Sequence, residues 1–287
     1  MEEYQRVVLG CVDGSSLSDA VADYSAWIAA RIQRPLTFLN TIERDKQEPR
    51  TDMTGNIGLG TRDDLLETLA SEDNEASKVR IAAGKEALER ARQRAAALGA
   101  TAQVLQRHGK LYENVVELHD IMRVLVLGLR GEDTQSAEDR VGSQVEEIIR
   151  SLSDPILLVT EDFTPPRSVV LAYDGSEKSK KALDMVATSP LFKTLPCHVV
   201  HVGNQENRSH KLLGEAASVL SQTGVHATFT SLKAEDVVAT LLAYQVKHEV
   251  DMIVMGAFSK NRLRSTLFGS FTATMISRTR KSLLLLR

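Results

Sequence analysis

The chain has 287 residues, of which 43% are hydrophobic and 25% are charged, and its formal net charge is −3. Such a chain is a globular protein with room for two domains, and its weak negative charge excludes general binding to nucleic acids or membrane surfaces. No apolar run approaches the ~20 residues of a membrane-spanning helix, and the acidic start lacks the apolar region of a signal peptide, so we expect a cytoplasmic protein.

The first half of the chain alternates short apolar runs, which predict buried strands, with segments whose apolar residues recur at helical spacing. Ser16 is the predicted N-cap of the first helix, and Gly99 lies at the expected C′ position of the long helix 75–98. The predicted strands are 6–12, 35–41, 101–106, 124–127 and 155–159, and the predicted helices are 17–28, 75–98, 113–119 and 143–151.

The segment 43–73 is different. It is polar, contains Pro49 and three glycines, and shows no convincing period, so it predicts a long loop or insertion with one short helix near Asp63–Leu69. A tolerated surface insertion is the simpler interpretation, and a lid over the neighbouring site is the alternative.

Pro165 and Pro166 then mark a stiff connector, which places the boundary between a first domain, 1–162, and a second, 163–287. Beyond it the alternation of strands and helices restarts. The predicted strands are 167–173, 198–202, 226–231, 251–255 and 283–286, and the predicted helices are 177–188, 207–223, 235–247 and one that starts at 269.

Matching residues recur at fixed distances in the two halves. Asp13 and Asp174 are 161 positions apart, whereas Gly99 and Gly224 are only 125 positions apart. The first half therefore carries 36 extra residues before Gly99, where the segment 43–73 lies. This spacing indicates an internal duplication.

The alternation within each half predicts an α/β domain with a parallel sheet and helices on both faces. Ligands of such sheets bind beyond the carboxyl ends of the strands, where the winding reverses. Asp13 and Asp174 follow the first strand of their halves, and Gly128 and Gly256 end the fourth strand. If the first and fourth strands are neighbours, each aspartate and its glycine loop line one crevice, where the carboxylate can accept a hydrogen bond from an adenine amino group or a ribose hydroxyl.

The glycine loops have the features of a phosphate site. Each runs from an apolar strand to a Gly-Ser pair that opens a helix, and helix N-termini present unpaired N–H groups and partial positive charge. The alternative interpretation is that the glycines only build a tight connection, and that Asp-Gly-Ser is a turn followed by a helix cap.

Other chemistries find no support. Cys11 and Cys197 have no metal-type spacing, and His198 and His201 lie three apart on a strand and so face opposite ways. The sequence contains no P-loop and no Gly-x-Ser-x-Gly elbow, and no base partner is visible for Ser15 or Ser176.

The chain resembles the universal stress proteins in their tandem two-domain form, over nearly its whole length. Nucleotide-binding members of that family carry an Asp at the end of strand one and the motif Gly, two residues, Gly, nine residues, then Gly-Ser or Gly-Thr. In the first half ten residues, instead of nine, separate Gly131 from Gly142, and in the second half Ser259 replaces the second glycine. Members of the other subclass lack the motif and do not bind ATP, so these departures bear on ATP binding.

The resemblance implies two Rossmann-like domains, each a five-stranded parallel sheet of order 3-2-1-4-5, that pair through their fifth strands as a pseudo-dimer within one chain; a homodimer stays open. It implies ATP or another adenine nucleotide as cofactor, with Mg²⁺ as a candidate companion. Asp13 and Asp174 would contact adenine, and the backbone of Thr41 and Val202 would flank the base. Ribose and phosphates would be held by Gly128, Arg130, Gly131, Gly142 and Ser143 in the first domain, and by Gly256, Phe258, Ser259, Gly269 and Ser270 in the second.

Charge slightly favours the second domain as the nucleotide site, because its loop carries Lys260, Arg262 and Arg264 whereas the first loop is rich in Glu and Asp. We therefore expect a tandem universal stress protein that binds an adenine nucleotide and acts as a stress-response sensor or adaptor. A scaffold with degenerate sites and no nucleotide is the first alternative. A slow ATP hydrolase is the second, and it lacks an evident base or nucleophile.

Overall fold

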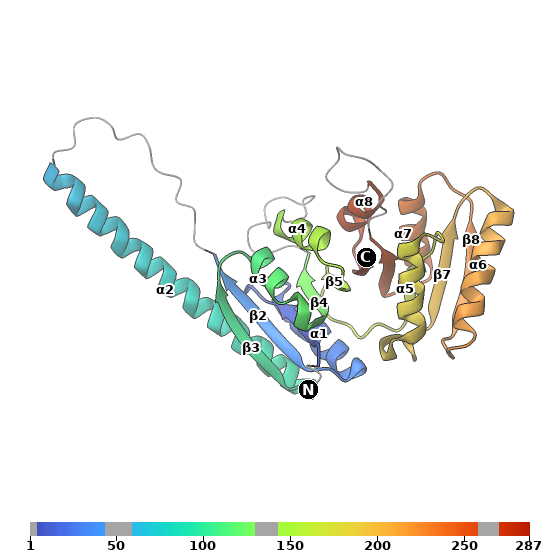
Figure 1. The fold of residues 1–287 in the computed structure, drawn as a ribbon, viewed down its shortest axis with the longest axis horizontal. Coiled ribbons are helices and arrows are strands. Elements are labelled where there is room, and N and C mark those ends of the chain that lie inside the picture. The colour runs from blue at the N-terminus through green and yellow to red at the C-terminus, as the bar shows by residue number, and fades with distance from the viewer. Residues whose placement is uncertain (1–4, 44–58, 130–142, 258–269) are drawn as a thin grey trace.

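The computed structural model describes residues 5–43, 59–129, 143–257 and 270–287 (Figure 1). Ten strands of these segments form one sheet in the order β3-β2-β1-β4-β5-β10-β9-β6-β7-β8. The strands are β1 (Val7–Cys11), β2 (Leu36–Ile42), β3 (Ala102–His108), β4 (Met122–Gly128), β5 (Ile156–Val159), β6 (Val169–Ala172), β7 (Cys197–Val202), β8 (Ala227–Leu232), β9 (Met252–Gly256) and β10 (Ser282–Leu286). The helices are α1 (Ser18–Ile32), α2 (Leu59–Ala97), α3 (Leu111–Glu117), α4 (Ser143–Ser151), α5 (Glu177–Thr188), α6 (Glu206–Leu220), α7 (Val237–Lys247) and α8 (Ser270–Arg278), with short 3-10 helices η1 (His119–Ile121) and η3 (Pro190–Phe192).

Both halves have the same strand order, β3-β2-β1-β4-β5 in the first and β8-β7-β6-β9-β10 in the second. Within each half neighbouring strands are parallel, so the predicted fold class and the order 3-2-1-4-5 are confirmed. The two halves meet where β5 and β10 pair in antiparallel fashion, with Leu157 opposite Leu284. Equivalent strands of the two halves therefore lie side by side at the centre of the sheet.

Helices cover both faces of the sheet. On one face, α1, α2, α5 and α6 contribute to a single hydrophobic cluster, and on the other face α3, α4, α7 and α8 contribute to a second. The strands read as nearly continuous apolar runs because both of their faces are buried. Each cluster contains residues of both halves, so the core continues across the β5–β10 junction.

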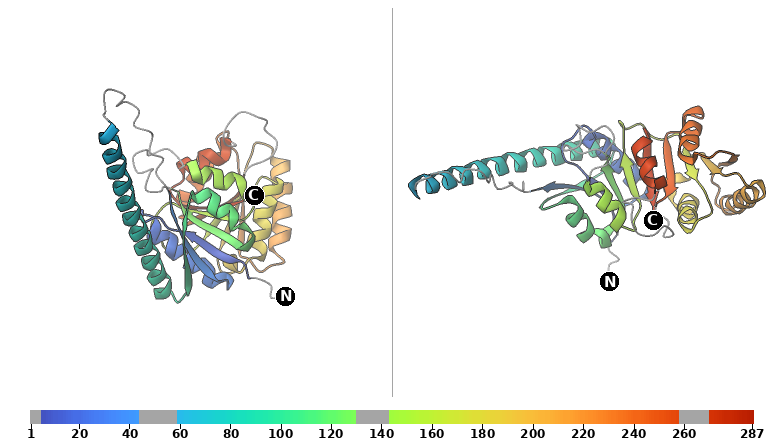
Figure 2. Two further views of the ribbon diagram at one scale, coloured as in Figure 1. Left: turned by 60° about the vertical axis from the view of Figure 1, so that its left-hand side comes forward. Right: turned by 90° about the horizontal axis from the view of Figure 1, so that it is seen from above.

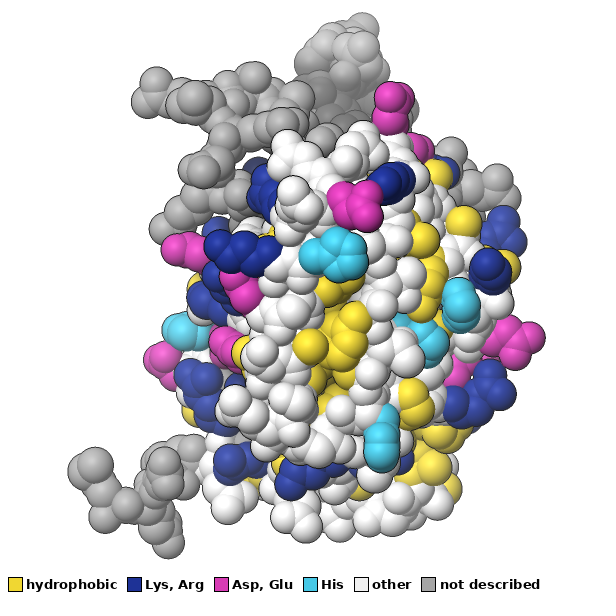
Figure 3. Space-filling model, turned by 90° about the vertical axis from the view of Figure 1, so that its right-hand side faces the viewer, with side chains coloured by type: hydrophobic (Ala, Val, Ile, Leu, Met, Phe, Trp, Pro, Cys, Tyr) yellow, Lys and Arg dark blue, Asp and Glu magenta, His cyan; other side chains and the backbone are white. Residues whose placement is uncertain are grey.

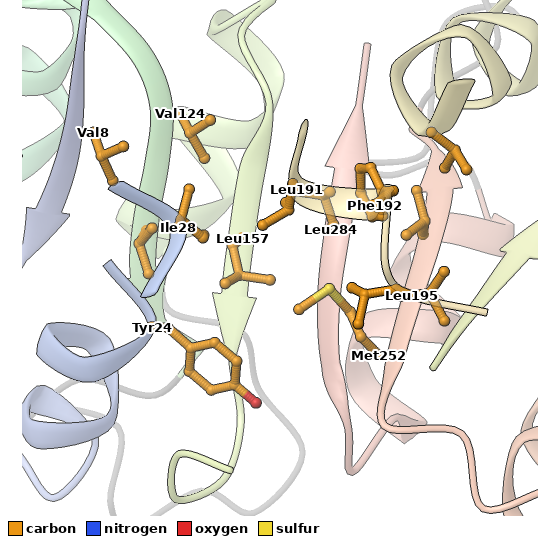
Figure 4. Close-up of a cluster of buried hydrophobic side chains, with 14 of the residues drawn as sticks. Val8, Tyr24, Ile28, Val124, Leu157, Leu191, Phe192, Leu195, Met252 and Leu284 are labelled. Atoms are coloured by element: carbon orange, nitrogen blue, oxygen red, sulfur yellow. The ribbon is translucent and has the colours of Figure 1, made fainter. Parts of the chain in front are cut away.

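Aromatic and aliphatic side chains fill this junction. Figure 4 shows Tyr24, Ile28 and Leu157 of the first half together with Leu191 and Leu284 of the second. Tyr24 also meets Phe163 of the connector edge to face, with ring centroids 4.8 Å apart. Phe163 thus holds the start of the connector against α1.

Helix α2 corrects the prediction for the segment 43–73. It runs over 39 residues from Leu59, so the predicted loop is wrong for residues 59–73, and the short helix expected near Asp63–Leu69 is part of a much longer one. Residues 44–58 lie outside the described part of the chain. Only the C-terminal half of α2 packs on α1, β2 and β3, while its start reaches far beyond the sheet (Figures 1 and 2). Once the packed half has formed, a helix can extend by one hydrogen bond per residue and needs no apolar period to do so. Residues 59–73 include four Leu, two Glu, one Ala and one Arg, which favour helix.

Ser16 is not the N-cap of α1. The helix begins at Ser18, and its N-cap residue, Leu17, makes no side-chain capping hydrogen bond. The hydroxyl that serves this turn belongs to Ser18, which is tied to the preceding loop. Most other predicted bounds lie within two residues of the observed ones, and Gly99 has the positive φ, 77°, expected just after a helix.

Candidate functional site

Asp13 lies two residues beyond β1, in a loop that its own side chain closes. Its Oδ1 accepts hydrogen bonds from the Ser15 backbone N–H and from the Ser18 hydroxyl, both at 2.9 Å. The Ser18 oxygen in turn accepts from the backbone N–H groups of Asp13 and Gly14 at 3.2 and 2.9 Å. Gly14 has a φ of 89°, which a residue with a side chain adopts only with strain. The loop therefore holds an exposed carboxylate at the carboxyl end of β1.

Asp174 occupies the equivalent position after β6. Its Oδ1 accepts from the Ser176 N–H at 2.9 Å, and Ser176 caps α5 by accepting from the Ser179 N–H at 3.2 Å. Gly175 has a φ of 75°. Partial burial raises the pKa of Asp174, but hydrogen bonds from Ser176 and Ser179 outweigh it and hold the pKa below its ordinary value, so the group is ionised at neutral pH.

Each carboxylate shares its edge of the sheet with the glycine at the end of the fourth strand. Strand β1 is hydrogen-bonded to both β2 and β4, and β6 to both β7 and β9. Asp13 thus follows the strand next to the one that Gly128 ends, and Asp174 and Gly256 have the same relationship. The half-buried residues Thr41 and Val202, predicted to flank a base, lie at the same edge near the ends of β2 and β7.

Several predicted site residues fall outside the described residues. Ser143 and Ser270 do open α4 and α8, so both helices begin where the Gly-Ser pairs predicted. The predicted site residues that lie outside the described part of the chain are Arg130, Gly131, Gly142, Phe258, Ser259 and Gly269.

Two buried polar side chains that the sequence analysis did not assign support the carboxylate loops. Asn40 Nδ2 donates to the Val12 carbonyl at 2.9 Å, and His201 Nδ1 donates to the Tyr173 carbonyl at 2.8 Å. Each accepting carbonyl immediately precedes Asp13 or Asp174. The sequence does mark these two residues, because each is a polar residue within an apolar strand and their positions differ by the repeat spacing of 161.

Gly256 has a packing role as well as a place in the motif. A Cβ atom added there would lie 2.6 Å from the backbone carbonyl carbon of Lys178 and 2.7 Å from the backbone nitrogen of Ser179. The end of β9 therefore touches the first turn of α5, and only glycine permits this approach. This contact supports the alternative interpretation, in which the glycine is needed for close packing between strand and helix.

The first domain has an additional polar contact at its site. Gln144, the second residue of α4, donates a side-chain hydrogen bond to Glu43 Oε1 and accepts one from the Tyr112 N–H at 3.3 Å. Glu43 directly follows β2, and Tyr112 lies in the first turn of α3. A carboxylate is thus fixed at the beginning of α4, beside the end of β2.

The remaining surface offers less. A pocket of about 140 Å³, lined by Ile28, Met185 and Leu191 among others, lies at the amino ends of the strands, away from both carboxylate loops. Among the residues described, no group of three or more His, Cys, Asp or Glu side chains has the spacing to hold a metal ion, and no helix is long and apolar enough to cross a membrane. Figure 3 shows positive and negative side chains intermixed on one face of the molecule.

Comparison with known proteins gives a consistent result. The model of the universal stress protein family matches residues 3–160 and again 166–287. A universal stress protein of Synechocystis sp. is 31% identical over 279 residues, covering 95% of this chain and 96% of its own. The crystal structure of a universal stress protein from Archaeoglobus fulgidus superposes with a TM-score of 0.72 at 17% identity, covering 100% of this chain and 99% of its own. A functionally unknown protein from Pseudomonas aeruginosa superposes with a TM-score of 0.60 at 13% identity, covering 98% and 92%.

Proposed function

Because this chain belongs to the universal stress protein family, as a tandem of two family domains, we propose that it binds an adenine nucleotide and acts as a stress-response sensor or adaptor. The proposed sites are the two crevices at the carboxyl ends of the strands. The observation that carries the proposal is that both domains hold an aspartate carboxylate in the same way at the same edge of the sheet. Asp13 and Asp174 are both exposed, both closed into a loop by Oδ1, and both preceded by a carbonyl that a buried side chain holds.

The donors and acceptors at each edge fit an adenine nucleoside. An ionised carboxylate accepts hydrogen bonds from the adenine amino group or the ribose hydroxyls, and the half-buried residues Thr41 and Val202 would flank the purine ring. The N–H groups at the starts of α4 and α8 suit phosphate oxygens. ATP is the nucleotide we favour, and Mg²⁺ would screen its phosphate charge.

The junction of the two domains suits a sensor. We propose that the β5–β10 pairing makes the chain a pseudo-dimer. Nucleotide binding in either domain would then change the stability of one hydrophobic core that both domains share. We also propose that the protein is cytoplasmic. The proposed function is nucleotide binding without hydrolysis, since no base or nucleophile is assigned to either crevice.

The test is to purify the protein without added nucleotide, denature it, and identify the released small molecule by chromatography and mass spectrometry. Adenine nucleotide at one or two molecules per chain would support one or two competent domains. An empty protein that also shows no heat of binding with Mg-ATP would contradict the proposal and favour a scaffold without nucleotide.

A further inference from the structure

The two proposed sites differ in one charged contact. In the first domain, Glu43 is half buried and its carboxylate accepts a hydrogen bond from Gln144, whose own carbonyl oxygen is held by the Tyr112 N–H. The ends of β2, α3 and α4 are therefore joined around one negative charge. Because two hydrogen bonds fix Gln144, the carboxylate is held in place instead of moving freely in solvent.

At the equivalent position the second domain has a neutral residue. The repeat spacing places Asn204 where the first domain has Glu43, and Phe271 where it has Gln144. Asn204 is exposed and neutral, and Phe271 is half buried against the core. The two domains thus share the aspartate after their first strand but differ in charge at the start of the helix that follows the glycine loop.

We propose that Glu43 is a specificity-determining residue that makes the first domain reject polyphosphates, so that the first domain binds adenosine or a monophosphate and the second binds ATP. The inference rests on the proposed function. A fixed carboxylate repels each phosphate charge at short range and offsets the partial positive charge of the α4 N-terminus. An uncharged nucleoside feels neither effect, so the discrimination depends on ligand charge.

The experiment isolates the first domain with Asp174→Ala in the full chain and compares ATP, AMP and adenosine by calorimetry, with and without Glu43→Gln. Glutamine has the same shape and keeps an oxygen that can accept from Gln144. If the phosphates bind at the start of α4, removing one negative charge there should raise ATP affinity by about tenfold or more, AMP affinity by less, and adenosine affinity not at all. Glu89→Gln, an equal change of charge on the exposed side of α2, is the matched control and should alter none of them.

The outcomes separate the two proposals. If adenosine binds in the Asp174→Ala background but Glu43→Gln leaves ATP affinity unchanged, or raises adenosine and ATP affinities equally, the inference is wrong and the proposed function stands. If neither wild type nor any variant binds an adenine ligand, the proposed function fails and the inference falls with it. Circular dichroism of each variant establishes that loss of binding is not loss of fold.

Discussion

Asn40 and His201 occupy equivalent positions in the two domains, and each donates a hydrogen bond to an equivalent backbone carbonyl, one from an amide and the other from an imidazole. Each lies in the second strand, is at least 93% buried, and donates one hydrogen bond to the carbonyl that precedes the site aspartate. Asn40 also accepts from Gln106 at 3.2 Å, and Gln106 donates to the Ile81 carbonyl of α2, so that the first site is linked to the long helix.

This equivalence predicts an order of tolerance at position 201. The amide nitrogen of asparagine lies close to where histidine has Nδ1, so His201→Asn should retain the bond to Tyr173 and cost little. His201→Leu leaves that buried carbonyl unpaired and should cost about 1–3 kcal/mol of unfolding free energy. Denaturant unfolding of both variants measures this order, and equal losses would show that packing, not the hydrogen bond, matters there.

The site aspartates should be needed for binding and not for folding. Asp13→Ala and Asp174→Ala each remove an exposed carboxylate whose hydrogen bonds are local. We expect each variant to lose nucleotide affinity at its own domain by about tenfold or more, in line with a lost charged hydrogen bond of ~1.5–3 kcal/mol. Calorimetry with ATP and AMP measures the loss, and normal binding by both variants would place the site elsewhere.

The lowered pKa of Asp174 predicts a pH dependence of stability. A carboxyl group with a folded-state pKa below its ordinary value of 3.8 stabilises the fold above that pH, and the contribution is lost as pH falls through the folded-state pKa. The stability difference between wild type and Asp174→Asn should therefore be constant from neutral pH down to about 5 and shrink below about 4. Denaturant unfolding at several pH values measures this difference in unfolding free energy. A difference that grows as the pH falls would contradict the prediction.

Gly256 should not tolerate a methyl group, whether or not a ligand binds. Gly256→Ala forces Cβ into the backbone of α5 and should cost about 1–3 kcal/mol of stability. Gly214→Ala is the control: it lies in α6 with open space around it and should stabilise the protein by about 0.5–1 kcal/mol. Thermal unfolding of the ligand-free protein compares them, and equal effects would remove the packing role.

Both cysteines should be inert in the folded protein. Burial raises the pKa of Cys11 and of Cys197 to about 12, so the reactive thiolate is scarce at neutral pH and also shielded. Labelling with a thiol reagent at pH 8 should modify neither residue within the lifetime of the native state, and both at once after unfolding in guanidinium. Rapid labelling of the native protein would show local opening of β1 or β7.

Local pattern was sufficient for most of the fold. Apolar runs of strand length, turn residues such as Asp13-Gly14, and the fixed spacing of 161 predicted the strands, the helices and the duplication. Pattern failed at α2, where the expected loop from 59 to 73 is helix, because an extension of a packed helix needs favourable propensity and no apolar period. It also misplaced the cap of α1, because the loop closed by Asp13 extends to Ser18 and the helix begins there.

Residues close together along the chain were sufficient to predict the two domains, the strands within them and the aspartates that follow the first strands. The pairing of the fifth strands was expected from the family resemblance alone, and two sets of side-chain contacts were not expected at all: Asn40 and His201 hold the carboxylate loops from 28 residues away, and Glu43 reaches Gln144 across 101 residues. These contacts depend on strand order and side-chain register, which distant residues settle together when both faces of the sheet are buried.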